Sequence, residues 1–139
     1  MRDDSEIQRR LAEAQSEFAL HLGARLVSAT PDRVECEMPV TGALANRNGV
    51  LHGGAIMGLA DNAGGTGTFL NLPEGKTTTT LESKTNFLRP VRMGDTARAV
   101  STPLHLGRTT QIWQTTIIRG DGKVAAIVTQ TQLVLDWQD

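Results

Sequence analysis

Aromatic residues and long apolar runs are scarce in this sequence. It has no tyrosine, three phenylalanines and two tryptophans among 139 residues. No stretch approaches the roughly 20 consecutive apolar residues that a membrane-spanning helix needs. We therefore expect a core of aliphatic and small side chains, and no membrane partner.

Cysteine and excess charge are also lacking. The single cysteine, Cys36, excludes an intramolecular disulfide, and its place on the apolar face of a strand indicates packing rather than catalysis. Lys and Arg total 14 against 15 Asp and Glu, so no overall field attracts nucleic acid or an anionic membrane. The first residues lack the apolar core of a signal peptide, which predicts a cytoplasmic protein.

The length predicts one domain over residues 1–139, with an N-terminal helix at 1–23 and a core at 24–136. Apolar residues recur there every three or four positions, which is the spacing of an amphipathic helix. They are Ile7, Leu11, Ala14, Phe18 and Leu22. Apolar and polar residues then alternate between Val34 and Val40, which predicts a strand paired with another near residues 25–29.

Residues 53–70 decide the interpretation. They read GGAIMGLADNAGGTGTFL, with six glycines and one charge, Asp61. Each interior glycine costs a helix about 1 kcal/mol relative to alanine, so propensity alone disfavours a helix here. A sheet curling closely around the segment would favour small residues, and we therefore predict a buried helix, with a glycine-rich loop as the alternative.

The rest of the chain predicts four antiparallel strands at residues 77–88, 96–104, 109–118 and 124–135. The break before the second strand contains Pro90 and Gly94, and the last two strands flank an Asp121-Gly122 hairpin signature. The order is helix, hairpin, buried helix and four strands, without an internal repeat.

Three motifs lie in this order. They are Asn46-x-x-Gly49-x-x-His52-Gly53-Gly54, Leu59-Ala60-Asp61-Asn62, and Asn86-Phe87-Leu88-Arg89-Pro90 with Gly94-Asp95. Together they resemble the PaaI-like branch of hotdog-fold thioesterases, over about residues 40–135. The resemblance implies an α+β fold with a curved antiparallel sheet around the glycine-rich helix. It also implies hydrolysis of an aryl-acyl CoA ester of the phenylacetate kind, or of a medium-chain acyl-CoA, by a homodimer that is often paired into a homotetramer.

The chemistry needs a donor for the oxygen that becomes negative when water attacks a thioester. Gly53 and Gly54 would open the helix with unpaired N–H groups, and their missing side chains leave room for an acyl group. Either amide could serve, and the resemblance favours Gly53. Taken without its neighbours, the glycine pair would indicate only a tight loop.

The chemistry also needs a base or a nucleophile. Asp61 is the only ionisable side chain between His52 and Glu74. At mid-helix it cannot cap its own helix, and an unpaired buried charge is costly, so function is favoured over structure. The sequence does not separate a general base from a nucleophile.

The spacing of these two groups constrains the site. Eight residues at 1.5 Å rise put Gly53 and Asp61 about 12 Å apart along one helix, too far for one carbonyl. If two such helices run antiparallel across a two-fold axis, Gly53 of one chain meets Asp61 of the other. We therefore predict that the homodimer is the minimal active unit.

Three further residues are candidates near the reacting groups. By the resemblance, the Asn46 amide orients water or the thioester, with a turn-forming asparagine as the alternative. His52 is assigned a positioning role in the loop. Also by the resemblance, Thr80 matches a Ser/Thr position on the first long strand that could hydrogen-bond the attacking water, with Thr79 as the alternative. Strand propensity alone also explains a run of threonines.

A basic rim for the phosphates of coenzyme A is expected at Arg89, Arg92 and Arg108, of which we favour Arg108. His21 and His105 have no companions at ligand spacing, so no metal is expected. No cofactor is expected either, because coenzyme A belongs to the substrate.

Two other functions fit the same fold. A non-catalytic acyl-CoA-binding module would keep the pocket, but it does not need Asp61. A hydratase or dehydratase would need Asp and His over adjacent acyl carbons, and His52 lies at the wrong end of the helix. A serine hydrolase is disfavoured because no serine stands in a Gly-x-Ser-x-Gly turn.

Overall fold

The computed structural model describes residues 4–138, without the side chains of residues 4, 5, 7 and 8. The helices are α1 (Asp4–Glu13), α2 (Glu17–Leu22) and α3 (Gly53–Leu70), with a 3-10 turn η1 (Gly42–Leu44). The strands are β1 (Arg25–Thr30), β2 (Arg33–Pro39), β3 (Lys76–Phe87), β4 (Thr96–Leu106), β5 (Thr110–Ile118) and β6 (Val124–Asp136). No helix in this described range is long and apolar enough to cross a membrane.

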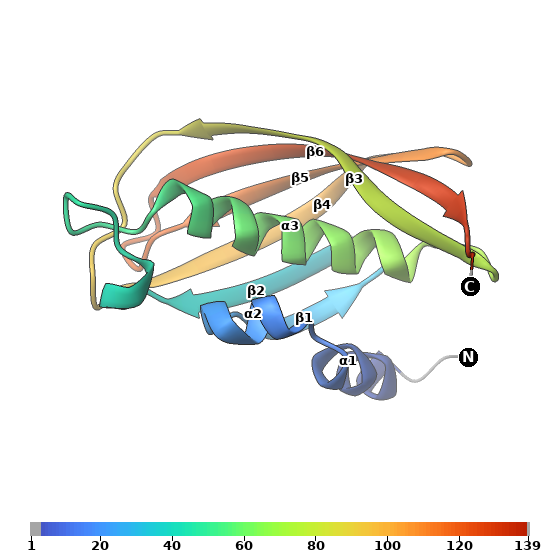
Figure 1. Ribbon diagram of the computed structural model, residues 1–139, viewed down its shortest axis with the longest axis horizontal. Coiled ribbons are helices and arrows are strands. Elements are labelled where there is room, and N and C mark those ends of the chain that lie inside the picture. Colours follow the sequence, from blue (N-terminus) through green and yellow to red (C-terminus); the bar gives the residue numbers. More distant parts are fainter. Residues whose placement is uncertain (1–3, 139) are drawn as a thin grey trace.

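The six strands form one antiparallel sheet in the order β1-β2-β4-β5-β6-β3. The sheet curves around α3, which crosses its concave face (Figure 1). The predicted hotdog architecture is confirmed. Strand β3 leaves the sequential order, because it lies at the edge beside β6 while β4 takes the place next to β2.

Glycine makes the close packing of α3 on the sheet possible. An added Cβ at Gly67 would lie 2.4 Å from the ring of Trp113, and one at Gly64 would lie 2.3 Å from Oε1 of Gln130. Both partners are fully buried side chains of the sheet. The expectation of a helix rather than a loop is confirmed, and its reason is the approach of large sheet side chains.

The N-terminal segment differs from the single helix expected over residues 1–23. Its described part, residues 4–23, forms two helices, because Ser16 begins a new one and its hydroxyl accepts a hydrogen bond from the Ala19 N–H at 3.1 Å. Gly23 ends that helix in the left-handed conformation, with φ 77°. Leu22 is buried but Phe18 is 60% exposed, so only part of the predicted apolar helix face is buried within this chain. The side chain of Ile7 lies outside the described residues.

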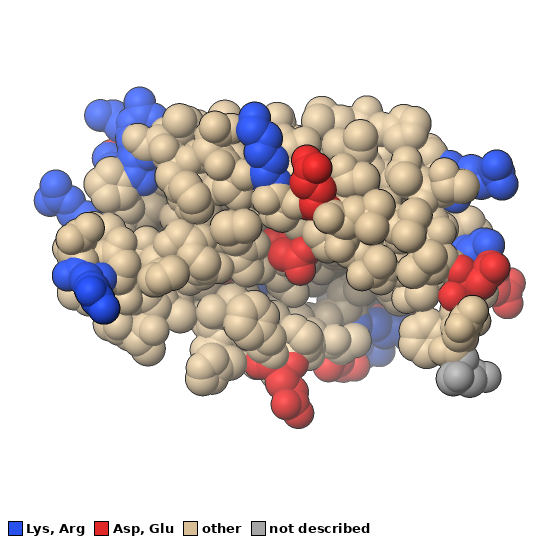
Figure 2. All heavy atoms as spheres, turned by 45° about the horizontal axis from the view of Figure 1, so that its top comes forward, with Lys and Arg blue, Asp and Glu red and all other residues tan. Residues whose placement is uncertain are grey.

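One side of the molecule combines the outer face of α3 with the unpaired edge of β3. Large apolar side chains on these two elements are exposed, namely Phe69, Leu81 and Phe87. Figure 2 shows that this side is largely uncharged, with most basic groups at its two ends and one basic and two acidic groups near its middle. An exposed edge strand beside an apolar patch is unusual for a monomer.

Candidate active site

The first turn of α3 has one free backbone donor. His52 is the N-cap residue, and its Nδ1 accepts the Gly54 N–H at 2.8 Å. That contact occupies one of the two amides considered as oxyanion donors. Within the described residues, nothing accepts a hydrogen bond from the Gly53 N–H. His52 therefore holds the start of the helix, and Gly53 presents the available donor.

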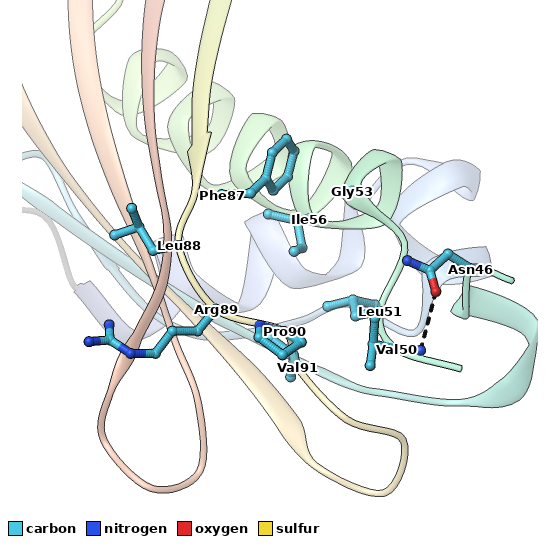
Figure 3. Close-up of a pocket in the computed structure, with 10 residues that line it drawn as sticks. All are labelled: Asn46, Val50, Leu51, Gly53, Ile56, Phe87, Leu88, Arg89, Pro90 and Val91. Carbon is cyan, nitrogen blue, oxygen red and sulfur yellow. Dashed lines mark hydrogen bonds between the residues drawn. The ribbon is translucent and has the colours of Figure 1, made fainter. Parts of the chain in front are cut away.

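The loop before α3 is held by Asn46. Its side-chain Oδ1 accepts hydrogen bonds from the N–H groups of Asn48, at 2.9 Å, and Val50, at 3.3 Å. The same amide therefore forms the turn that the sequence allowed as an alternative. Its nitrogen is directed toward the beginning of α3 (Figure 3). One end of the amide fixes the loop while the other faces the helix that Gly53 opens.

A hollow of about 430 Å³ lies at this end of α3. Its lining is mainly apolar and comprises Asn46, Val50, Leu51, Gly53, Ile56, Phe87, Leu88, Arg89, Pro90 and Val91. The Phe87 ring lies over Gly53, where an added Cβ would come within 3.0 Å of it (Figure 3). Glycine at position 53 thus leaves space for this ring, which the sequence did not single out as part of a site.

Asp61 lies farther along α3, on its exposed face. Its Oδ1 accepts hydrogen bonds from the Thr80 hydroxyl at 2.8 Å and from Nε2 of Gln130 at 2.7 Å. The expectation of an unpaired buried charge is therefore wrong for the single chain. No residue in the described range donates to Oδ2. The carboxylate is held by one oxygen and open at the other.

Thr80 and Gln130 reach Asp61 from neighbouring strands. Thr80 is on β3 and Gln130 is on β6, which are paired in the sheet. Of the two threonines considered, Thr80 is the one with a described hydrogen bond to Asp61. Its hydroxyl is directed to the carboxylate, rather than left free for water. Gln130 was not predicted from the sequence as a site residue. Its position on the same strand face as the apolar Val128 and Ala126 could have marked it as a polar side chain directed into the core.

The two halves of the chemistry are separate in one chain. Gly53 lines the hollow, whereas Asp61 is absent from its lining and is held against β3 and β6. The eight-residue spacing along α3 corresponds to about 12 Å. A single chain thus presents a donor site and a carboxylate site that cannot act on the same carbonyl.

The three candidate arginines do not form one cluster. Arg89 lines the hollow, but its side chain extends away from Gly53 and donates to the Val124 carbonyl at 2.8 Å (Figure 3). Arg92 borders a second hollow, with Asp95 and Arg119. Arg108 belongs to the turn between β4 and β5. That turn lies at the opposite end of the sheet from the connection between β3 and β4, which carries Arg89 and Arg92 (Figure 1). All three are exposed.

Cys36 is fully buried on β2. Burial raises the pKa of its thiol to about 11, against a smaller opposing effect of the hydrogen bond from Asn62. A buried thiol with a raised pKa is a poor nucleophile, which confirms the packing role expected for Cys36.

Known proteins share both sequence and structure with this chain. The model of the thioesterase superfamily matches residues 48–126. A Haemophilus influenzae protein provisionally named as an esterase is 40% identical over 117 residues, which are 84% of this chain and 83% of the relative.

Two solved structures extend this likeness to the fold. A thioesterase from Haemophilus influenzae matches with a TM-score of 0.86 and 32% identity, over 100% of this chain and 94% of that one. The PaaI protein from the phenylacetic acid degradation operon of E. coli matches with a TM-score of 0.81 and 25% identity, over 94% and 95% of the two chains. The resemblance to hotdog thioesterases is thereby confirmed, and this chain belongs to the thioesterase superfamily.

Proposed function

We propose that this protein is an acyl-CoA thioesterase whose active sites form between two chains. In each site, Gly53 of one protomer supplies the oxyanion donor and Asp61 of the other supplies the carboxylate. Family membership supports the reaction type. The observation that carries the composite site is the separation of a free N–H at the hollow from a carboxylate outside it.

The exposed side of the molecule supports such a pairing. On the outer face of α3, one turn after Asp61, a Cβ at Gly65 would meet nothing within 4 Å. A second α3 could therefore approach closely and antiparallel, as a two-fold axis requires. The free edge of β3 and the exposed Phe69 and Leu81 would be covered in the same step.

Two routes of hydrolysis fit these groups. As a general base, Asp61 takes a proton from water while the water oxygen bonds to the thioester carbon. The carbon–sulfur bond then breaks, and the sulfur takes the proton from Asp61 to leave as the CoA thiol. As a nucleophile, an Asp61 oxygen bonds to that carbon and the carbon–sulfur bond breaks, so that CoA leaves as its thiolate. Water then adds to the mixed anhydride, the bond to Asp61 breaks to release the acid, and a proton from that water protonates the thiolate. In both routes the Gly53 N–H stabilises the negative carbonyl oxygen, and the Asn46 amide nitrogen lies where it could orient water or the thioester.

The hollow indicates the kind of acyl group. Its apolar walls, with Phe87 beside Gly53, suit an aryl-acyl or medium-chain aliphatic group, such as a phenylacetyl ester. Arg89 and Arg92 lie at the same end of the molecule and Arg108 at the other, so a two-chain site could draw its phosphate contacts from both protomers. No cofactor beyond the substrate is proposed. A cytoplasmic location and pairing of dimers into a homotetramer stay predictions.

The proposal is tested by release of free thiol from a panel of aryl-acyl and aliphatic CoA esters. We expect turnover with at least one class, with Asp61 required. A binding module would instead retain acyl-CoA without releasing thiol, and a hydratase would change the acyl chain while leaving the thioester intact. Either result would overturn the proposal.

A further inference from the structure

Gln130 is a buried amide whose described side-chain contact is with Asp61. The residue has no exposed surface, and Nε2 donates to Oδ1 of Asp61 at 2.7 Å. Its Oε1 is buried, and no described residue donates a hydrogen bond to it. The polar end of a core side chain is thus directed at one oxygen of the candidate catalytic group.

Stability alone does not account for this residue. A buried amide with an unsatisfied oxygen is less favourable than an apolar side chain of similar shape. Its hydrogen bond ends on a carboxylate that is exposed in the single chain and could be solvated by water instead. The free energy of folding would therefore be little changed, or improved, with methionine at position 130.

Gly64 provides the space that Gln130 occupies. An added Cβ at position 64 would lie 2.3 Å from Oε1 and 3.4 Å from Cδ of Gln130. The helix therefore carries a glycine, at a cost of about 1 kcal/mol relative to alanine, where the amide passes beside it to Asp61. The hydrogen bond to Asp61 thus depends on two residues from different elements. Gln130 on β6 makes it, and Gly64 on α3 leaves the space for it.

Thr80 completes the arrangement from β3. Its hydroxyl lies 2.8 Å from the same Oδ1 and 3.2 Å from Oε1 of Gln132, and the shorter contact places its proton on the carboxylate. Both donors then hold one oxygen and leave Oδ2 without a described donor. A carboxylate with two donors on one oxygen has its rotation about the terminal torsion restricted. The free oxygen then keeps a fixed direction on the outer face of α3.

We infer that Gln130 is a positioning residue that, with Thr80, holds Oδ1 of Asp61 so that Oδ2 is the reacting oxygen. This inference rests on the proposed function. Oδ2 either takes the proton from water or forms the bond to the thioester carbon, whereas Oδ1 stays bound to its two donors. Gln130 acts through Asp61 and does not contact substrate, so its loss should lower kcat and leave KM unchanged.

The test compares Gln130→Met with Gln111→Met. Gln111 is a matched control, because it is a buried glutamine on β5 whose Oε1 accepts from the indole N–H of Trp113 and makes no described contact with Asp61. We expect Gln130→Met to lower kcat about 10-fold through misplacement of the carboxylate, with KM within about twofold and an unchanged or higher melting temperature. Gln111→Met should keep kcat and lose melting temperature.

Gly64→Ala provides an independent perturbation that keeps the glutamine. Its Cβ displaces the Gln130 amide, so kcat should also fall about 10-fold, while the helix gains from alanine. Both changes remove the same contact, the hydrogen bond between Gln130 and Asp61. The kcat of the double variant Gly64→Ala/Gln130→Met should therefore fall about 10-fold rather than about 100-fold.

Three results would overturn the inference. Wild-type kcat in Gln130→Met, beside an inactive Asp61→Asn, would refute the positioning role and leave the proposed function intact. Equal losses of kcat and melting temperature in the Gln130 and Gln111 variants would make Gln130 a packing residue. Near-normal hydrolysis by Asp61→Asn itself would instead refute the proposed function, and the inference with it.

Discussion

The two faces of α3 use small residues for different reasons. On the face toward the sheet, Gly64 and Gly67 are explained within the chain, because Gln130 and Trp113 occupy the space that side chains would fill. On the outer face, Gly65 has nothing near it, and Asp61 is exposed beside it. A helix tolerates costly glycines where something approaches closely. On the inner face the structure shows what approaches, and on the outer face we propose that a second chain does.

The largest effect should come from a bulky charge on the outer face. Gly65→Arg fits the single chain, because no atom lies within 4 Å of the added Cβ, but it would keep two α3 helices apart. Each hollow would keep its own Gly53 N–H but lose the partner's carboxylate, worth about 100-fold, together with every other contact that the partner makes to the substrate, so turnover should fall by more than about 100-fold. Sedimentation should find a folded monomer. Glu74→Arg, in an exposed turn, is the control, and an active Gly65→Arg monomer would contradict the account.

Asp61→Asn should reduce turnover by at least about 100-fold, the scale of losing acid or base help. The variant keeps an oxygen for Thr80 and Gln130 to donate to, so the fold and KM should be preserved. Thiol release at saturating substrate measures the effect. Asp32→Asn, in the β1–β2 turn, serves as a matched loss of an exposed carboxylate. Near-normal hydrolysis would remove Asp61 from the mechanism.

Gly67→Ala should weaken the inner face without touching the site directly. The added Cβ would lie 2.4, 2.5 and 2.8 Å from three ring atoms of the buried Trp113, which has little room to move. Overpacking of this kind outweighs the gain in helix propensity, and we expect a loss of about 2 kcal/mol in the free energy of unfolding. Denaturant titration measures it. An unchanged denaturation midpoint would contradict this prediction and would mean that the Trp113 side chain moves aside to accommodate the added methyl group.

Cys36 should give the smallest functional effect. With a thiol pKa of about 11, against a reference of 9.0, the thiolate fraction at pH 8 is about 100-fold lower than in a free thiol, and burial slows attack further. A chromogenic disulfide reagent should therefore react with the unfolded protein and leave the native protein active. Rapid labelling of the native protein with loss of activity would show that β2 opens near the core.

The sequence predicted which segments form strands because the period-two pattern records which side chains face the core. The fourth long strand was expected at residues 124–135 and is observed as β6 (Val124–Asp136). The pattern does not record neighbours, so the pairing of β3 with β6 was not predicted. The N-terminal helix was predicted as one, because apolar spacing continued across Ser16 and its capping role was not recognised.

The candidate site was predicted where backbone and spacing carry the chemistry. The resemblance favoured Gly53 over Gly54, Asp61 is the only ionisable side chain of the predicted helix, and the helical rise gave the distance between them. The contacts that hold Asp61 could not be predicted, because Gln130 reaches it from 69 positions away along the chain. Only the fold brings that strand under the helix. Gly64 had a visible sequence signal, but its reason is the side chain opposite it.

Subunit mixing tests the shared site most directly. Gly53→Pro removes the N–H at a helix position that tolerates proline, and Gly53→Ala controls for the added Cβ beside Phe87. If Gly53→Pro and Asp61→Asn homodimers are each inactive, unfolding and refolding them together at equal amounts should restore about a quarter of wild-type activity. Half of the dimers would then be mixed, with one intact site of two. Mixed dimers that stay inactive would show that each chain carries its own complete site, which contradicts the account.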